Sequence, residues 1–302
     1  PQAVGSIFNM NGTATGDETA MIRDVYYEQA LLDRLLVIRA GRIDLTGGIE
    51  CEPCTVAFDS NAFANDEYGQ FLNGALVNNP TIPFPSIGLG AAIVARPASW
   101  FYLAGGVGDA AATGKNWDID NAFDETFYIG ETGILANIPS PNGDLVGAYR
   151  VGAWYSPQSR ERLDGSGREV SGHAGWYASL DQMAWRENAA KDDTQGLGLF
   201  GRFGSADERV NEIKTFWSAG AQYQGLIPKR DDDVIAAGFA TGRFSKDAGL
   251  SAQAESVVEA YYRIEVFKWL QITPSIQYIW SPGGDKNEDD AVAFAIRAFI
   301  LF

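Results

Sequence analysis

A two-residue hydrophobic alternation runs through nearly the whole length of this chain and limits the folds that it can adopt. In Val292–Phe302 every second side chain is apolar, and Arg297 falls on the opposite face beside small residues. The segments Val258–Val266 and Leu270–Trp280 alternate in the same way. Successive side chains of a β-strand point to opposite faces, whereas a helix repeats every 3.6 residues, so the pattern predicts strands.

The same alternation predicts ten more strands upstream, and Pro1–Met10 is one further candidate. The ten segments lie near 233–245, 213–225, 194–205, 170–187, 144–157, 126–138, 99–109, 87–96, 35–45 and 20–30. Short connections such as 267–269 alternate with long ones such as 110–125, which are rich in Gly, Asp and Asn. About 14 strands joined in this way predict an all-β, up-and-down antiparallel barrel.

The two faces of the predicted strands differ in a way that favours a membrane barrel over a soluble sandwich. Aromatic residues close the apolar face at Tyr155, Trp176, Trp217, Tyr223, Tyr278, Trp280 and Phe302. The other face carries Arg96, Glu131, Arg150, Arg202, Glu259, Arg263 and Arg297. Membrane interfaces favour aromatic belts, and a wet lumen tolerates charges that a sandwich core would not. The alternative from another class is a soluble, lectin-like β protein.

Composition excludes several classes of function. Lys and Arg total 23 and Asp and Glu total 39, so the net charge is 23 − 39 = −16, which argues against binding nucleic acid. The only histidine, His173, is expected to be a solvated rim residue, which leaves little room for an enzyme, a metal site or a cofactor. Cys51 and Cys54 bound a C-E-P-C loop and favour a local disulfide over a zinc or redox site.

One stretch, Asn65–Asn79, departs from strand periodicity. Its apolar residues follow helical spacing, Asn65 can cap the start and Pro80 lies just past the end. The segment is either a surface helix at the rim or an infolded segment that narrows the pore, and we favour the second. The polar residues of this candidate constriction, which either line it or hold the loop through side-chain-to-backbone bonds, are Asp59, Asn61, Asn65, Asp66, Gln70 and Asn73.

Several runs of the sequence resemble a known family, the carbohydrate-selective porins of Gram-negative outer membranes. The asparagine-rich run and the Pro-Gly-Gly-Asp turn within the last of these runs are the most specific. The matching runs are Ala40–Leu45, Phe58–Pro83, Gly88–Pro97, Gly175–Glu187 and Val257–Asp285, followed by the terminal Phe302.

The resemblance implies one outer-membrane domain over residues 1–302, with 58–83 as a loop that carries a short helix. It implies a 16-stranded transmembrane barrel for sugars such as glucose, so about 14 recognisable strands would leave the earliest ones upstream of Pro1. The implied partners are outer-membrane lipids and small sugars, and a homotrimer is the assembly to consider. Passive, selective diffusion of carbohydrates is the leading function, and a general or ion-selective porin is the nearest alternative.

A sugar-selective pore needs hydrogen-bond donors and acceptors for hydroxyl groups and an aromatic plate for an apolar C–H face. Trp154 shares a strand face with Arg150 and is the candidate plate. The alternative for each charge is that it only neutralises an opposite charge and stiffens the wall. The candidate pore-lining residues are Arg39, Arg96, Glu131, Arg150, Trp154, Glu259, Arg263 and Arg297.

Overall fold

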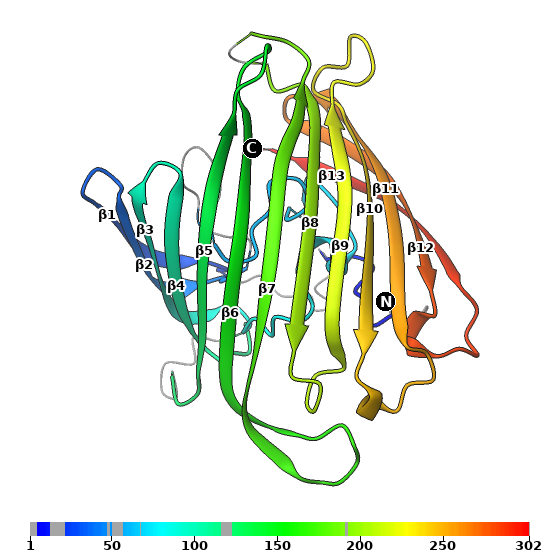
Figure 1. Ribbon diagram of the computed structural model, residues 1–302. Helices are drawn as coiled ribbons and strands as arrows, with labels where there is room; N and C mark the ends of the chain where they lie inside the picture. The colour runs from blue at the N-terminus through cyan, green and yellow to red at the C-terminus, as the bar shows by residue number, and fades with distance from the viewer. Residues whose placement is uncertain are drawn as a thin grey trace.

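The computed structural model describes residues 5–12, 22–46, 49, 57–66, 68–115, 123–190 and 193–301. Thirteen strands form one sheet in chain order, and each is antiparallel to its neighbours (Figure 1). They are β1 Val25–Leu31, β2 Leu36–Ile43, β3 Gly88–Ala98, β4 Phe101–Asp109, β5 Thr126–Ile138, β6 Leu145–Glu161, β7 Glu169–Arg186, β8 Gly196–Ala206, β9 Ile213–Gln224, β10 Val234–Phe244, β11 Ala254–Phe267, β12 Leu270–Trp280 and β13 Ala291–Ile300. The helices are short: α1 Gly74–Val77, η2 Lys246–Ala248 and η3 Pro282–Gly284.

The predicted all-β, up-and-down topology is confirmed, but the strand count is lower. A strand at Pro1–Met10 is not found in its described part, because residues 5–12 run inside the curved sheet and Phe8 is buried there. β1 and β13 are the two edges of the sheet and do not pair with each other. Within the described residues the sheet is therefore an open curve of 13 strands rather than a closed ring of 16.

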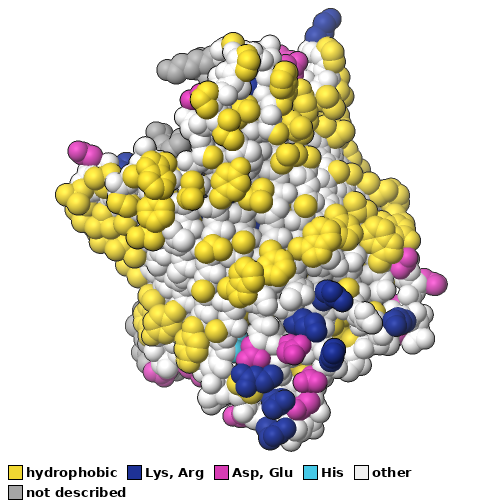
Figure 2. Space-filling view, viewed as in Figure 1, with side chains coloured by type: hydrophobic (Ala, Val, Ile, Leu, Met, Phe, Trp, Pro, Cys, Tyr) yellow, Lys and Arg dark blue, Asp and Glu magenta, His cyan; other side chains and the backbone are white. Residues whose placement is uncertain are grey.

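The alternation predicted for β13 sorts its side chains as expected. Phe294 and Ile296 are 78% and 79% exposed on the outer face. Arg297 points inward, where its Nη2 donates to the Gln70 carbonyl at 2.7 Å. Figure 2 shows hydrophobic side chains spread over the outer face of the sheet. None of the helices in the described ranges is long and apolar enough to cross a membrane.

Aromatic side chains gather on the outer face near one rim. Trp217 lies 5.0 Å from Phe239, and Phe239 lies 6.2 Å from Trp280, measured between ring centroids. Trp176 lies 5.0 Å from Phe203 further along the same face. Such a band is typical of the boundary between lipid chains and headgroups.

The connections divide between two rims. The rim at the bottom of Figure 1, here called the long-loop rim, carries the connections 44–87, 110–125, 162–168, 207–212, 245–253 and 281–290. The opposite rim carries the connections 32–35, 99–100, 139–144, 187–195, 225–233 and 268–269. The β6–β7 hairpin extends well beyond the other strands at the long-loop rim (Figure 1). The predicted alternation of short and long connections is therefore only partial, because 187–195 and 225–233 on the opposite rim are longer than 162–168 and 207–212 on the long-loop rim.

The interior is occupied by the connection between β2 and β3. In Figure 1 its cyan trace lies within the curve of the sheet. Phe58 and Ile82 belong to a buried cluster with wall residues of β3–β7, and Phe71 and Leu76 belong to a second cluster with residues of β8–β12. Two apolar cores therefore lie inside the sheet, in the space where an empty barrel would hold water.

The helix predicted over Asn65–Asn79 is limited to α1. Asn73, not Asn65, caps it, because the Asn73 side chain accepts from the Ala75 amide at 3.0 Å. Asn65 instead donates to the Val77 carbonyl at 2.8 Å. The rest of the segment bonds either to the wall, as the Leu72 amide does to Glu259, or to its own loop, as the Gln70 side chain does to the Ala62 carbonyl, in place of continuing the helix.

Candidate pore constriction

We call residues 57–87, which fold into the sheet from β2 towards β3, the infolded segment. Glu259 of β11 holds its middle: the carboxylate accepts from the Leu72 amide at 2.9 Å and from the Asn73 amide at 2.8 Å. Glu131 of β5 holds its start and accepts from the Asp59 amide at 3.0 Å. Both glutamates are almost fully buried, and charge-assisted bonds to backbone amides are among the stronger hydrogen bonds in proteins.

A third wall carboxylate acts in the same way on residues 5–12. Glu255 of β11 accepts from the amides of Ile7 and Phe8, each at 3.0 Å, and from the Gly283 amide at 2.7 Å. Its side chain is fully buried. Three inward glutamates thus attach interior backbone to the wall.

This arrangement corrects the expectation that Glu131 and Glu259 offer open acceptors to a sugar. Both face inward as the alternation predicted, but their oxygens already accept bonds from the infolded segment. Glu131 also accepts from the hydroxyls of Tyr177, at 2.9 Å, and Tyr102. In this structure the two carboxylates shape the interior rather than present free acceptors.

A buried cation of the wall, Arg202, also attaches the segment, whereas Arg150 is paired within the wall. Arg202 of β8 donates from Nη1 to the Leu76 carbonyl at 2.6 Å, and its Nε lies 3.6 Å from Asp59 Oδ1. Arg150 pairs with Asp181 of β7, and both side chains are buried. Burial raises the pKa of Asp59, which lies in the connection, to about 6, while Arg202 and the bond from the Asn79 amide oppose the rise.

Trp154 is not an open plate. It is 3% exposed, with its ring 6.4 Å from that of Phe127 and 5.3 Å from that of His173. His173 is also 3% exposed, which corrects its expected position as a solvated rim residue. Both side chains are buried because the infolded segment and the strands around it fill this side of the interior. A side chain that points inward from the sheet is therefore not always in contact with water.

Partly exposed charged groups lie around the tip of the infolded segment and also bond to it. Arg263 donates to the Gly69 carbonyl at 3.1 Å, and Arg297 donates to the Gln70 carbonyl at 2.7 Å. Tyr68 is 44% exposed and its ring stacks on Phe299 of β13 at 6.0 Å.

The first strands complete this group. Arg23 donates from Nη1 to the Tyr68 hydroxyl at 2.9 Å, which links the tip to the start of β1. Arg39 pairs with Glu28 at 2.8 Å and lies 4.2 Å from the ring centre of Tyr26, which is also 44% exposed. We call the set of these four arginines and two tyrosines the arginine–tyrosine cluster: Arg23, Tyr26, Arg39, Tyr68, Arg263 and Arg297.

Sequence reasoning included only part of this cluster. Arg39, Arg263 and Arg297 were predicted from their inward alternation. The helical spacing of Asn65–Asn79 predicts an apolar role for Tyr68, and the alternation does not single out Arg23 or Tyr26. The feature that points to Tyr68 is its chemistry, because a tyrosine in a polar connection can offer both a ring face and a hydroxyl group to a solute.

The remaining predicted residues lie elsewhere. Arg96 is at the rim opposite the long-loop rim, where it borders a hollow of about 310 Å³ beside Trp100. Asn61 donates to the Leu180 carbonyl at 2.9 Å and Gln70 to the Ala62 carbonyl at 2.7 Å, so both hold the loop. Asp66 accepts from the Tyr68 amide at 2.9 Å. Cys51 and Cys54 fall outside the described residues.

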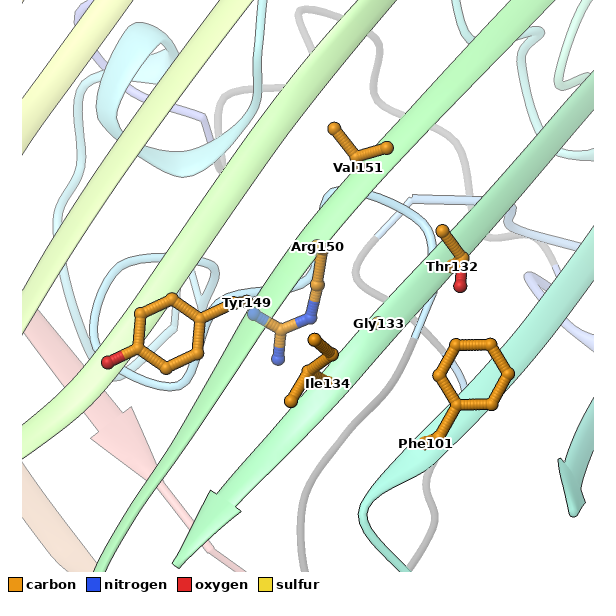
Figure 3. Close-up of a pocket in the computed structure, with 7 residues that line it drawn as sticks. All are labelled: Phe101, Thr132, Gly133, Ile134, Tyr149, Arg150 and Val151. Carbon is orange, nitrogen blue, oxygen red and sulfur yellow. The ribbon is translucent and has the colours of Figure 1, made fainter. Parts of the chain in front are cut away.

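A hollow of about 300 Å³ on β4–β6 belongs to the outer wall. Phe101, Ile134 and Tyr149 surround Gly133 in it (Figure 3). Ile134 is 50% and Tyr149 41% exposed on the face that carries the other apolar side chains. The hollow therefore faces away from the interior and is not part of the constriction.

A curved antiparallel sheet that is apolar and aromatic outside and charged inside, with a segment folded into it, defines the class of outer-membrane porins. The family model described as "Carbohydrate-selective porin, OprB family" matches residues 2–302. The chain belongs to this family, as the resemblance in its sequence indicated. It is an outer-membrane protein whose outer face contacts lipid and whose interior serves the passage of small solutes.

Individual relatives are distant. Porin B of Pseudomonas aeruginosa is 23% identical over 94% of this chain and 69% of its own length. Porin AaxA of Chlamydia pneumoniae is 23% identical over 98% of this chain, which spans 62% of that protein. The high-pH structure of Pseudomonas putida OprB shares the fold, with a TM-score of 0.77, 20% identity and coverage of 99% of this chain and 77% of its own. These proteins are porins and not enzymes, in agreement with the predicted non-enzymatic function.

Proposed function

We propose that this porin provides a passive, selective path for small carbohydrates such as glucose, and that residues 58–83 form its constriction. The observation that carries the proposal is the arginine–tyrosine cluster. It places three arginines beside residues 68–70 at the tip of the infolded segment, where Tyr68 is half-exposed. Arg39 and the half-exposed Tyr26 lie on β2 and β1. Arg150 and Arg202, in contrast, are almost fully buried in the wall.

The chemistry of the cluster suits a neutral polyol. Guanidinium groups can donate several hydrogen bonds in a fixed fork to sugar oxygens, and the Glu28 carboxylate has lone pairs that can accept from sugar hydroxyls. The ring of Tyr68 or Tyr26 offers an apolar face for sugar C–H groups, and each hydroxyl adds a donor and an acceptor. Conduction requires that such contacts remain weak and exchangeable, which partly exposed groups allow.

The test is the block of single-channel ion current by glucose. Tyr68→Ala should weaken glucose block more than it changes the open conductance, because it removes the ring face without removing a charge. Trp154→Phe is the matched control, since that side chain is buried away from the cluster. Equal loss of block in both variants, or no loss in Tyr68→Ala, would contradict the proposed path.

A general or ion-selective porin is the second candidate function, favoured by the net charge of −16. The reversal potential in a KCl gradient separates the two. A carbohydrate path lined by the arginine–tyrosine cluster should show little cation preference. Strong cation selectivity together with equal permeation of sugars and other small solutes would support the alternative.

A homotrimer in the outer membrane is also proposed for this family member. The broad apolar outer face can contact either lipid or a second copy. Native mass spectrometry in detergent distinguishes the two states, and a monomer at all protein concentrations would rule the trimer out.

A further inference from the structure

A hollow lined by both apolar and charged side chains lies at the long-loop rim, apart from the arginine–tyrosine cluster. Its volume is about 490 Å³, within the range of small-molecule sites. Three elements meet there: the end of the infolded segment, the β6–β7 hairpin and the loop between β8 and β9. We call it the mouth pocket, and its lining includes Pro80, Pro83, Arg160, Leu163, Asn211 and Glu212.

The charged groups of the mouth pocket differ from those around it. Within the described residues, neither the Arg160 guanidinium nor the Glu212 carboxylate makes a hydrogen bond or an ion pair. Neighbouring cations of the same rim are paired: Arg162 lies 2.9 Å from Asp164, and Arg209 lies 2.6 Å from Asp207. The pocket thus holds one donor group and one acceptor group whose hydrogen-bonding capacity is available to a solute.

The frame of the pocket is held in place by bonds outside it. The Leu163 amide donates to the Arg209 carbonyl at 3.0 Å, which joins the hairpin to the β8–β9 loop. The Glu212 carbonyl accepts from the Ser245 amide at 2.7 Å. Asn79 donates to the Phe203 carbonyl at 3.1 Å and so fixes the chain just before Pro80. A preformed pocket spends little ordering free energy on binding a solute.

We propose that the mouth pocket is a capture site for a neutral, hydroxyl-rich solute of about monosaccharide size. Arg160 donates to hydroxyl oxygens, Glu212 accepts from hydroxyl hydrogens, and the two proline rings contact an apolar C–H face. A charged solute would meet one favourable and one unfavourable group, whereas a neutral polyol uses both. The proposal rests on the proposed carbohydrate function and adds a first binding step on the long-loop side of the constriction.

The experiment compares glucose added to one side or the other of single channels inserted in a known orientation. Combined Arg160→Gln and Glu212→Gln substitutions should lower the rate of glucose block several-fold for sugar added on the long-loop side. Block from the opposite side should stay unchanged, because the arginine–tyrosine cluster is intact. Arg168→Gln is the matched control, since Arg168 lies on the same hairpin but faces Asp164 at 3.7 Å.

The outcomes separate the two proposals. If the wild type is blocked by glucose and the double variant behaves identically from both sides, the mouth pocket is not a capture site and the carbohydrate function stands. If glucose blocks the wild type from neither side and does not enter proteoliposomes that contain it, both proposals fail. Heat-modifiable migration on gels verifies that each variant is folded.

Discussion

Single carboxylates attach the interior to the wall, and Glu259 is the clearest case because it accepts two adjacent backbone amides. A glutamine at this position keeps one acceptor oxygen but turns an NH₂ group towards amides that also donate. Hydrogen bonds to charged groups contribute about 1.5–3 kcal/mol each.

We therefore expect Glu259→Gln to lower the free energy of unfolding by about 1.5–3 kcal/mol. The variant should also increase the noise of the ion current, because the infolded segment is held less firmly. Thermal unfolding and single-channel recording measure the two effects. Glu169→Gln, at an exposed position at the start of β7, is the control. A quiet channel of wild-type stability would show that Glu259 does not hold the segment.

Glycine is required where a tyrosine ring crosses the inner wall. A Cβ on Gly133 would lie 2.1 Å from Tyr102 Cε1, and a Cβ on Gly152 would lie 2.3 Å from Tyr177 Cζ. Both tyrosines donate to Glu131. A methyl group at either glycine would push a donor away from this carboxylate.

Gly133→Ala should consequently destabilise the protein by about 1–3 kcal/mol, the usual cost of overpacking. Gly130→Ala on the same strand is the matched control, because the nearest atom to its Cβ is 3.9 Å away. Thermal unfolding measures the stability of both variants. Equal stability would argue against the close approach of the Tyr102 ring to Gly133.

At the scale of elements, the strand alternation of β13 sets which side chains meet lipid. Ile296→Arg should cost about 2–4 kcal/mol near the middle of the membrane, whereas Val292→Arg, near the strand end, should cost about 0–1 kcal/mol. Folding into lipid vesicles at increasing denaturant gives both values. Similar costs at the two positions would mean that β13 does not cross the membrane in the register described here.

For the whole molecule, the infolded segment is an insertion whose two ends meet. The Asp59 side chain accepts from the Asn79 amide at 3.0 Å, so a short glycine linker can replace residues 60–78 without straining the sheet. We expect this deletion to raise the conductance and remove sugar selectivity while the strands still pair. Shortening the loop at 246–249, which lies outside the interior, is the control. An unchanged conductance after the deletion would exclude the segment as the constriction.

The strands, the direction of their two faces and the membrane setting follow from the amino-acid sequence alone. These properties are local: the alternation at Val292–Phe302 needs no distant partner to sort Ile296 from Arg297. Long connections such as 110–125 are recognisable by their content of Gly, Asp and Asn. The resemblance to the family rests on runs such as Phe58–Pro83.

Only the tertiary structure decided which inward residues remain open. Glu131 and Glu259 accept bonds from residues 72 and 187 positions away in the chain, and no periodicity encodes such pairings. Trp154 is inward by alternation and yet buried, because alternation gives the direction of a side chain and not the occupant of the space that it enters. The contact between Tyr68 and Arg23 depends on the position of the infolded segment. That position is fixed jointly by the carboxylates and cations of the wall, such as Glu259 and Arg202.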